Sequence, residues 1–292
     1  MSAPLTSILR YPGGKSKALK AILPQILKNT FSEFREPFVG GGSVFIAVKQ
    51  KVTPDVKFRI NDLNPDIYCF WNVLKRNGYL FADEITRIKN EERNGKALFN
   101  RLRAQDPRTL SEFDRAVRFF LLNRISFSGG TDTSGYSQEA FEKRLTNTII
   151  EKLPLLSDLV YNIEVSNLDY SDLLFEGGES TFIFLDPPYY KTTKNKLYGK
   201  NGLFHTTFDH EKLAQTMRFC SQNYSYRWLI TYDDTPEIRA LYDFAYIKEW
   251  QLTYGVNNIK GVTASKIGDE LLISNFPLSM AIQTPLSQTN SY

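Results

Sequence analysis

A carboxylate, two prolines and two tyrosines follow a short apolar run in the segment FIFLDPPYYK, residues 182 to 191. The apolar run predicts a buried strand, and Pro187 and Pro188 end it because neither proline can donate a hydrogen bond to a sheet ladder. The chain therefore turns at Asp186 and presents an acid, a rigid turn and the ring of Tyr189 together. Such a strand end is a common place for chemistry in an open α/β sheet. A solvated aspartate in a simple proline turn would give the same pattern, so other segments have to separate the two interpretations.

The DPPY turn has the groups that methylation of an exocyclic amine on a base requires. The lone pair of such an amine is delocalised into the ring, and two acceptors that hold both amine hydrogens favour a tetrahedral nitrogen. The Asp186 carboxylate and the backbone carbonyl of Pro187 or Pro188 are those acceptors in this hypothesis. Tyr189 then stacks on a base that has been turned out of a duplex. Methylation at carbon 5 of cytosine would instead need a cysteine nucleophile, and neither cysteine of the chain has a suitable context.

A second candidate site is the glycine turn in EPFVGGGS, which leads from a strand into a helix that begins near Ser43. Asp62 ends the next predicted strand, about 20 residues further on, where an acid can accept hydrogen bonds from a ribose diol. This pairing leaves the cofactor open between a dinucleotide and S-adenosylmethionine. The spacing differs from GxGxxG, and an uncharged turn suits a nucleoside without a pyrophosphate, so S-adenosylmethionine is favoured. A further glycine turn, PGGK, adds a lysine and Tyr11.

The predicted elements form a sheet that can position these groups. Strand, glycine turn, helix, strand and acid make up the first half of a nucleotide-binding α/β sheet. Residues 17 to 28 have the apolar spacing of one helical face. Later in the chain, YNIEVSNLDY, FIFL and YRWLITYD predict strands, His210 to Asn223 a helix, and FAYIKEW and DELLISNF two strands joined by a loop.

Residues from about 75 to 159 differ in character, because they are helical, basic and poor in strand signals. Ten basic residues stand against five acidic ones between Arg87 and Arg124, an excess larger than the net charge of +4 of the whole chain. A solvated helix face is the usual reason for such a run, but the excess also suits a phosphate backbone. The apolar stripe within EFDRAVRFFLL predicts a helix that leaves Arg115 and Arg118 outside. NRISFSGG then predicts a loop or hairpin.

The composition is that of an ordinary globular protein, with 42% hydrophobic and 23% charged residues in 292 positions. No run approaches the roughly 18 apolar residues that span a bilayer, and the first residues lack the apolar stretch of a signal peptide. We therefore expect a cytoplasmic protein that does not bind a membrane. Cys69 and Cys220 have no metal-ligand spacing and only two histidines to help them, so we expect both to be buried and no metal to be bound.

Six segments in order resemble the Dam-like class of DNA adenine-N6 methyltransferases: RYPGGK, EPFVGGGSVF, NDLNPDIYCFWNVLK, NRISFSG, LDPPYY and DELLISN. The ordered set is highly specific, although each piece alone is not. The resemblance runs from about residue 8 to 275 and implies an α/β fold, a Rossmann-like class I methyltransferase sheet with an inserted, mainly helical target-recognition subdomain. It divides the chain into a catalytic domain of residues 1–74 and 160–280, an insertion of residues 75–159 and a polar tail of residues 281–292.

The resemblance also implies roles for individual residues. The catalytic turn consists of Asp186, Pro187, Pro188 and Tyr189. The residues that match contacts to S-adenosylmethionine are Tyr11, Gly14, Lys15, Phe38, Gly40, Gly41, Gly42, Ser43, Asp62, Asp169, Tyr170 and Asp186.

One segment departs from the family. The Dam type carries NRYGYNG where this chain has NRISFSG, so Phe127 and Ser128 replace the pair that enters the duplex beside the target adenine. A guanine-reading arginine also has no counterpart, and Asp132 lies near its place, so a GATC target is doubtful. We expect Phe127 and Ser128 to contact DNA, and Arg124 either to read a base edge or to pair with an acid and orient the loop.

Four lysines follow the catalytic turn in YKTTKNKLYGKNG with no acid among them, which predicts a loop that contacts phosphates. The lysines expected to bind DNA are Lys191, Lys194, Lys196, Lys200 and, between the last two predicted strands, Lys260.

Several other functions stay open on the residues alone. Enzymes that methylate cytosine N4 more often carry Ser-Pro-Pro, and enzymes that methylate glutamine favour Asn-Pro-Pro-Tyr. Adenine in RNA is an alternative substrate to adenine in DNA. The chain could also be a DNA-binding module that lost catalysis, or a dinucleotide oxidoreductase, which would leave DPPY unexplained. We expect a monomer that methylates adenine in double-stranded DNA. The target sequence and a cognate restriction endonuclease for the same site stay open.

Overall fold

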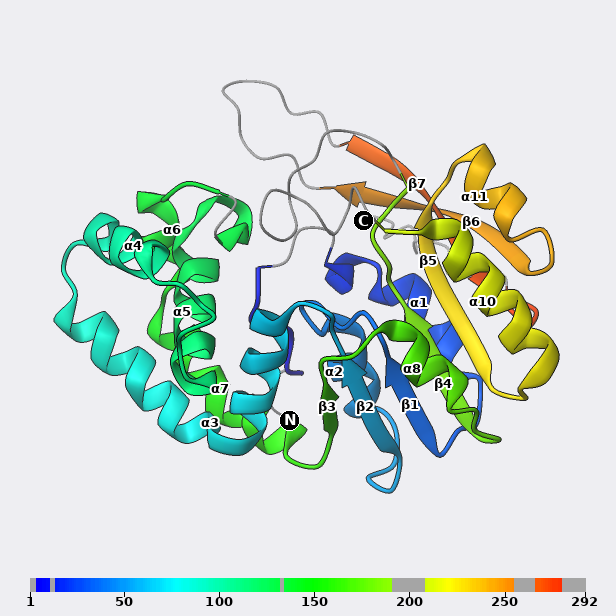
Figure 1. Ribbon diagram of the computed structural model, residues 1–292, viewed down its shortest axis with the longest axis horizontal. Helices are drawn as coiled ribbons and strands as arrows, with labels where there is room; N and C mark the ends of the chain where they lie inside the picture. Colours follow the sequence, from blue (N-terminus) through cyan, green and yellow to red (C-terminus); the bar gives the residue numbers. More distant parts are fainter. Residues whose placement is uncertain (1–3, 11–13, 132–133, 191–207, 255–265, 280–292) are drawn as a thin grey trace, which may run out of the picture.

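The computed structural model describes residues 4–10, 14–131, 134–190, 208–254 and 266–279. These residues form an α/β structure with a central seven-stranded sheet, helices on both faces of the sheet and a group of helices at one end (Figure 1). Among the helices of these ranges, none combines the length and the apolar character that crossing a membrane requires.

The strands have the order β3-β2-β1-β4-β5-β7-β6. Five of them run parallel: β1 (Glu33–Glu36), β2 (Lys57–Asn61), β3 (Glu164–Ser166), β4 (Thr181–Leu185) and β5 (Arg227–Asp233). Strand β7 (Lys266–Ser274) is antiparallel to both β5 and β6 (Tyr246–Tyr254). The order reverses between β1 and β4, and ligands of open α/β sheets bind at the carboxyl ends of the strands beside such a reversal. The strands predicted from the sequence are confirmed, and the two predicted turns follow β1 and β4.

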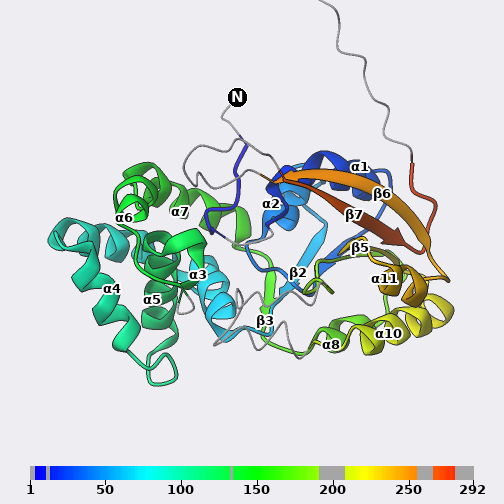
Figure 2. The same cartoon turned by 90° about the horizontal axis from the view of Figure 1, so that it is seen from above.

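Two cores lie on the two faces of the sheet. Helices α1 (Leu19–Leu27) and α2 (Ser43–Lys49) cover one face, and α8 (Tyr170–Phe175), α10 (His210–Asn223) and α11 (Pro236–Leu241) cover the other (Figure 2). In β4, Phe182 and Phe184 belong to the first core, whereas Ile183 and Leu185 belong to the second. Every residue of β4 is buried, because side chains of a strand alternate between faces and both faces are covered.

The segment between β2 and β3, which contains the proposed insertion of residues 75–159, is mainly helical. Its elements are α3 (Pro65–Glu91), α4 (Gly95–Ala104), α5 (Glu112–Ile125), the 3₁₀ helix η2 (Phe127–Gly129), α6 (Gln138–Arg144) and α7 (Asn147–Val160). Helix α3 starts beside the sheet and is interrupted by a non-helical residue, Asn77. Its aromatic rings pack on α5, where Phe70 stacks on Phe120 at 6.0 Å and Phe81 meets the same ring at 5.6 Å.

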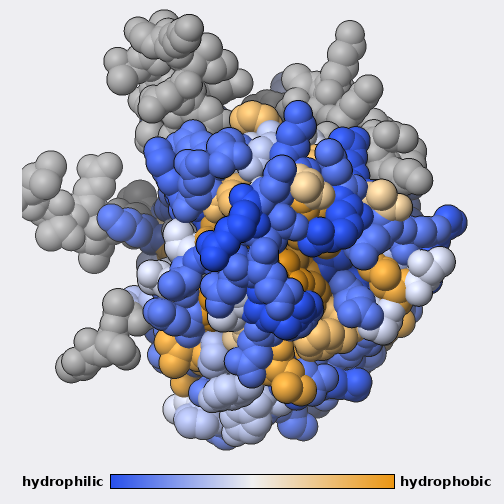
Figure 3. All heavy atoms as spheres, turned by 90° about the vertical axis from the view of Figure 1, so that its left-hand side faces the viewer, coloured by the Kyte–Doolittle hydropathy of each residue, from blue (hydrophilic) through white to orange (hydrophobic). Residues whose placement is uncertain are grey.

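Several basic residues of this insertion form ion pairs or hydrogen bonds with other groups of the protein. Arg87 forms ion pairs with Glu84 and Glu91, and Arg115 pairs with Asp66. The prediction that Arg118 lies outside is wrong, because helix α5 is buried on all sides from Ala116 to Ile125 and the Arg118 Nε donates to the Leu102 carbonyl at 2.8 Å. The surface of this end of the molecule is mostly hydrophilic, with apolar side chains between the polar ones (Figure 3).

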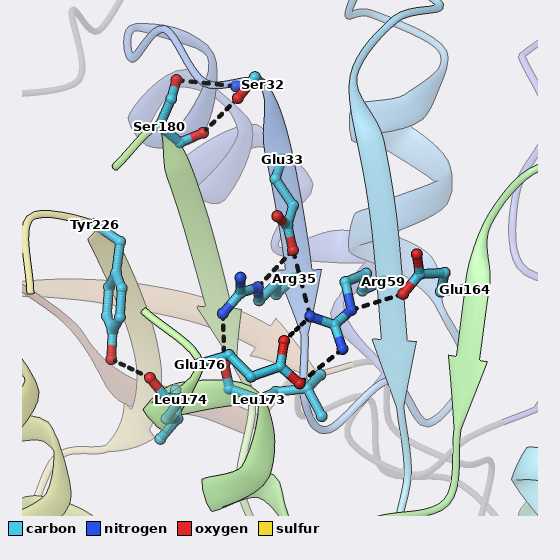
Figure 4. Close-up of polar contacts among 10 residues, drawn as sticks. All are labelled: Ser32, Glu33, Arg35, Arg59, Glu164, Leu173, Leu174, Glu176, Ser180 and Tyr226. Carbon is cyan, nitrogen blue, oxygen red and sulfur yellow. Dashed lines mark hydrogen bonds and ion pairs between the residues drawn. The ribbon is translucent and has the colours of Figure 1, made fainter. Parts of the chain in front are cut away.

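A polar network ties α8 to the sheet (Figure 4). Arg35 and Arg59 are neighbours in the β1–β2 register, and the Arg35 guanidinium donates to the Leu173 carbonyl in α8 at 2.7 Å. Arg59 forms ion pairs with Glu176, just after α8, and with Glu164 on β3 at 2.9 Å. These contacts fix the helix whose first turn carries Tyr170, one of the predicted site residues.

Candidate active site

The Asp186 carboxylate lies at the carboxyl end of β4 and is held through one oxygen. Thr231 on β5 is buried, and its hydroxyl donates to Asp186 Oδ1 at 2.8 Å. The Lys15 ammonium lies 2.8 Å from the same oxygen. Within the part of the chain that the structure describes, no hydrogen bond reaches Oδ2. The carboxylate therefore keeps an acceptor oxygen for a further donor.

The rest of the catalytic turn is held by the neighbouring strands. Pro187 is buried, and Pro188 and Tyr189 are half-buried. The Tyr189 hydroxyl donates to Glu270 Oε2 on β7 at 2.9 Å. The backbone N–H of Tyr190 donates to Asp233 Oδ1 on β5, also at 2.9 Å.

Lys15 lies in the 3₁₀ helix η1 (Lys15–Lys17) and is only 4% exposed. Its ammonium contacts Asp186 and lies 4.6 Å from the centre of the Tyr189 ring. A buried ammonium is costly unless a charge compensates it, and the Asp186 carboxylate does so here. The sequence grouped Lys15 with the cofactor, and the structure places its ammonium on the Asp186 carboxylate.

The glycine turn after β1 needs residues without a side chain. Gly40 has a φ of 45° and Gly42 a φ of 69°, in the left-handed region that favours glycine. A Cβ atom at Gly42 would lie 2.4 Å from the Phe45 ring and 2.5 Å from the Trp71 ring. The Trp71 Nε1 also donates to the Gly40 carbonyl at 3.1 Å. Helix α2 begins at Ser43, as predicted.

Asp62 follows β2 and fastens the glycine turn. Its Oδ2 accepts the Gly40 N–H at 2.9 Å, and its Oδ1 accepts the Asn64 N–H at 2.9 Å. Burial raises the pKa of Asp62 to about 6, and the two N–H donors oppose this shift. A carboxylate has about four acceptor positions, so both oxygens can accept another hydrogen bond.

Asp169 and Tyr170 lie at the start of α8. The Asp169 carboxylate caps this helix by accepting the Ser171 N–H at 3.0 Å. The Tyr170 ring packs against Phe38, which precedes the glycine turn, with a centroid distance of 5.3 Å. The carboxyl ends of β1, β2 and β3 thus meet at one edge, with Phe38, Asp62 and Asp169 following them.

The sequence analysis did not predict four buried polar residues of this region: Glu36, Thr231, Asp233 and Glu270. Glu36 ends β1, and burial, followed by the negative charge of Asp186, raises its pKa well above the usual range, whereas the Phe45 N–H lowers it. Thr231 and Asp233 interrupt the apolar strand WLITYD with period two, and that signal could have pointed to a buried polar function. No sequence pattern names their partners, because those partners lie on other strands.

The predicted DNA-contacting residues lie in different environments. Arg124 is 5% exposed, and its guanidinium donates to the Ile8 carbonyl at 2.8 Å and the Arg144 carbonyl at 2.7 Å. Burial lowers the pKa of Arg124 to about 10. The expected acid partner is wrong, because these acceptors are backbone carbonyls. The burial of the side chain favours the loop-orienting role over base reading. Phe127 is 60% exposed, and the following residue, Ser128, has a φ of 51°.

The predicted loop or hairpin around NRISFSGG is confirmed by the bridge between Ser126 and Tyr136. Both cysteines are buried as predicted, and burial raises the pKa of Cys69 to about 11. The predicted site residues that lie outside the described ranges are Tyr11, Lys191, Lys194, Lys196, Lys200 and Lys260.

The fold and the site together define a class of protein. The parallel part of the sheet reverses its strand order between a glycine turn and an acidic diproline turn, and an acid follows the second strand, as in α/β enzymes that bind a nucleoside cofactor at these strand ends. The model of the family described as D12 class N6 adenine-specific DNA methyltransferase matches residues 11–256. The chain belongs to this family, and its activity is site-specific methylation of adenine in DNA.

Two relatives align with this chain over most of their length. A DNA adenine methylase of Vibrio cholerae is 26% identical over 275 residues, which cover 91% of this chain and 94% of the relative. The type II methyltransferase M1.LlaDCHI of Lactococcus lactis subsp. cremoris is 23% identical over 285 residues, or 93% of this chain and 96% of the relative. A solved SAM-dependent O-methyltransferase of Thermotoga maritima aligns over 92% of this chain and 67% of that chain at 10% identity, with a TM-score of 0.37 that is too low to bear on the fold.

Proposed function

We propose that this protein transfers a methyl group from S-adenosylmethionine to N6 of an adenine that is turned out of double-stranded DNA and held against Asp186. The observation that carries this proposal is the arrangement of the carboxylate. Thr231 and Lys15 hold Oδ1, which leaves Oδ2 as an acceptor at the reversal point of the sheet. An exocyclic amine has two hydrogens to donate, and Oδ2 with the carbonyl of Pro187 or Pro188 can accept both.

In this mechanism the residues of the turn act on the nucleophilic nitrogen. Holding both amine hydrogens orients the nitrogen lone pair and favours its tetrahedral form. When bound, the cofactor would supply an electrophilic sulfonium methyl group and a neutral thioether as the leaving group. The Asp186 carboxylate and the prolyl carbonyl would hold the amine hydrogens during the transfer, and water would take the proton that the methylated nitrogen loses.

The position of Lys15 supports this assignment. Its ammonium contacts Asp186 Oδ1 and lies over the face of Tyr189, so a cation already lies on the ring face on which the mechanism stacks the adenine. We infer that Lys15 leaves the ring when the base enters and that the adenine then stacks on Tyr189.

The cofactor fits at the ends of β1, β2 and β3. We propose that the Asp62 carboxylate accepts the ribose hydroxyls while it keeps its bonds to the glycine turn. Leu63 and Leu168, which lie next to Asp62 and Asp169, are large apolar residues that are exposed at these strand ends. A purine ring would cover such side chains, together with Phe38.

We propose that the helical insertion recognises the target sequence, with the exposed Phe127 entering or reading the duplex. An aromatic ring that is largely exposed in the free protein gains most when a base pair covers it. A cognate restriction endonuclease for the same site is a further proposal, which the type II relative supports. We also propose that the enzyme acts as a monomer.

The experiment is a methyl-transfer assay with labelled S-adenosylmethionine and duplex DNA, followed by modification-sensitive sequencing of the product. We expect N6-methyladenine at a defined site with the native protein, and none with folded Asp186→Ala. Label on cytosine, label only on RNA, or full activity of Asp186→Ala would each contradict the proposal.

A further inference from the structure

Two acids, Asp233 and Glu270, are paired directly opposite each other in the β5–β7 ladder. Asp233 is 2% exposed and Glu270 is 1% exposed. Acids directly opposite in an antiparallel pair destabilise it, and burying each carboxyl adds a desolvation cost. This arrangement therefore needs a compensating use.

The two acids hold Tyr189, the last residue of the catalytic turn, and Tyr190, the residue that follows it. Tyr189 donates its hydroxyl to Glu270 Oε2 at 2.9 Å, and Tyr190 donates its backbone N–H to Asp233 Oδ1 at 2.9 Å. Thr231, two residues before Asp233, holds the first residue of the turn, Asp186. Side chains of β5 and β7 thus form hydrogen bonds at both ends of the turn.

The chemistry of the turn explains why side-chain acceptors are required. Pro187 and Pro188 have no N–H, so this part of the turn cannot be fixed by backbone donors. The Tyr189 ring is held at its hydroxyl by Glu270, while its face is turned to the Lys15 ammonium, 4.6 Å from the ring centre. A ring that is fixed before a base arrives loses less entropy when the base stacks on it.

We propose that Glu270 is a positioning residue that fixes the Tyr189 ring for the target base, and that Asp233 fixes the next peptide in the same way. The inference rests on the proposed stacking role of Tyr189. It goes beyond that role because it assigns a function to Glu270, the second acid of DELLISN. It also predicts that loss of the Tyr189 hydroxyl slows methylation. When Tyr189 lacks its hydroxyl, the buried Glu270 carboxylate loses this hydrogen-bond donor. That loss costs more free energy than the loss of an exposed hydroxyl would.

The test is a double-mutant cycle with Tyr189→Phe and Glu270→Leu, measured as single-turnover methylation of an adenine duplex at saturating DNA and S-adenosylmethionine. Each single variant should slow the reaction roughly fivefold, the rate equivalent of one hydrogen bond. The double variant should also be about fivefold slower, because both changes remove the same contact. A double variant slowed by the product of the two single effects overturns the proposal.

Glu270→Gln keeps the shape and one acceptor oxygen, and it should stay within about twofold of the native rate. Asp269→Asn, at the exposed neighbouring position of β7, is the matched control and should leave the rate unchanged. The same cycle is measured in the free energy of unfolding. Coupling in unfolding without coupling in the methylation rate shows a purely structural contact and also overturns the proposal. If the native protein methylates DNA and the cycle is multiplicative, the proposed function stands and only this inference fails.

Discussion

Replacing Thr231 by valine removes one of the two donors that the described residues place on the Asp186 carboxylate, and almost nothing else. Valine has nearly the volume of threonine, and Thr231 is fully buried inside β5, so packing is kept. The lost hydrogen bond runs from the hydroxyl to Asp186 Oδ1 at 2.8 Å. Hydrogen bonds to charged groups contribute about 1.5 to 3 kcal/mol. Lys15 stays on the same oxygen, so the lower value of about 1.5 kcal/mol applies, which corresponds to roughly a tenfold change in rate.

The assay is single-turnover methylation of an adenine-containing duplex, with DNA affinity measured in parallel. We expect Thr231→Val to slow methyl transfer about tenfold while DNA affinity changes less than twofold, because Thr231 acts on the orientation of Asp186. Thr181→Val is the matched control, since Thr181 is buried at the opposite end of β4 and should leave the rate unchanged. A folded Thr231→Val protein that reacts at the native rate would refute the role assigned to Oδ1.

Three further variants test other parts of the site. Asp186→Ala should keep DNA binding but abolish methyl transfer, and residual transfer above a few per cent in a folded protein would end the mechanism. Affinity for S-adenosylmethionine should fall as the pH drops through about 6, the raised pKa of Asp62, because the ionised carboxylate is the better ribose acceptor; calorimetry should show no such pH dependence for Asp62→Asn. The free energy of unfolding depends on pH in the opposite direction. Because the pKa of Asp62 is raised in the folded protein, its ionised carboxylate lowers the free energy of unfolding above about pH 6. This cost disappears below the ordinary pKa of an aspartate. Phe127→Ala should weaken binding to target DNA more than binding to unrelated DNA, and an equal loss on both would place recognition elsewhere in the insertion.

The sequence determined the types of element and the residues that follow each strand. The apolar run before Asp186, the diproline stop and the glycines before Ser43 act locally, since backbone sterics alone end a strand or allow a left-handed turn. The structure confirms that each element lies where these signals predict it.

Only the tertiary structure decided which side chains share these strand ends. Lys15 contacts Asp186 although 171 positions of sequence separate them. Glu270 contacts Tyr189 from β7, the antiparallel strand that comes last in the chain. Arg118 was predicted to lie on the surface, and Arg124 to read a base edge or pair with an acid, but both are buried and donate to backbone carbonyls. Such partners could not be predicted, because the desolvation of a buried polar group is compensated by whichever acceptor the packing brings within reach, and packing depends on contacts between segments far apart in the chain.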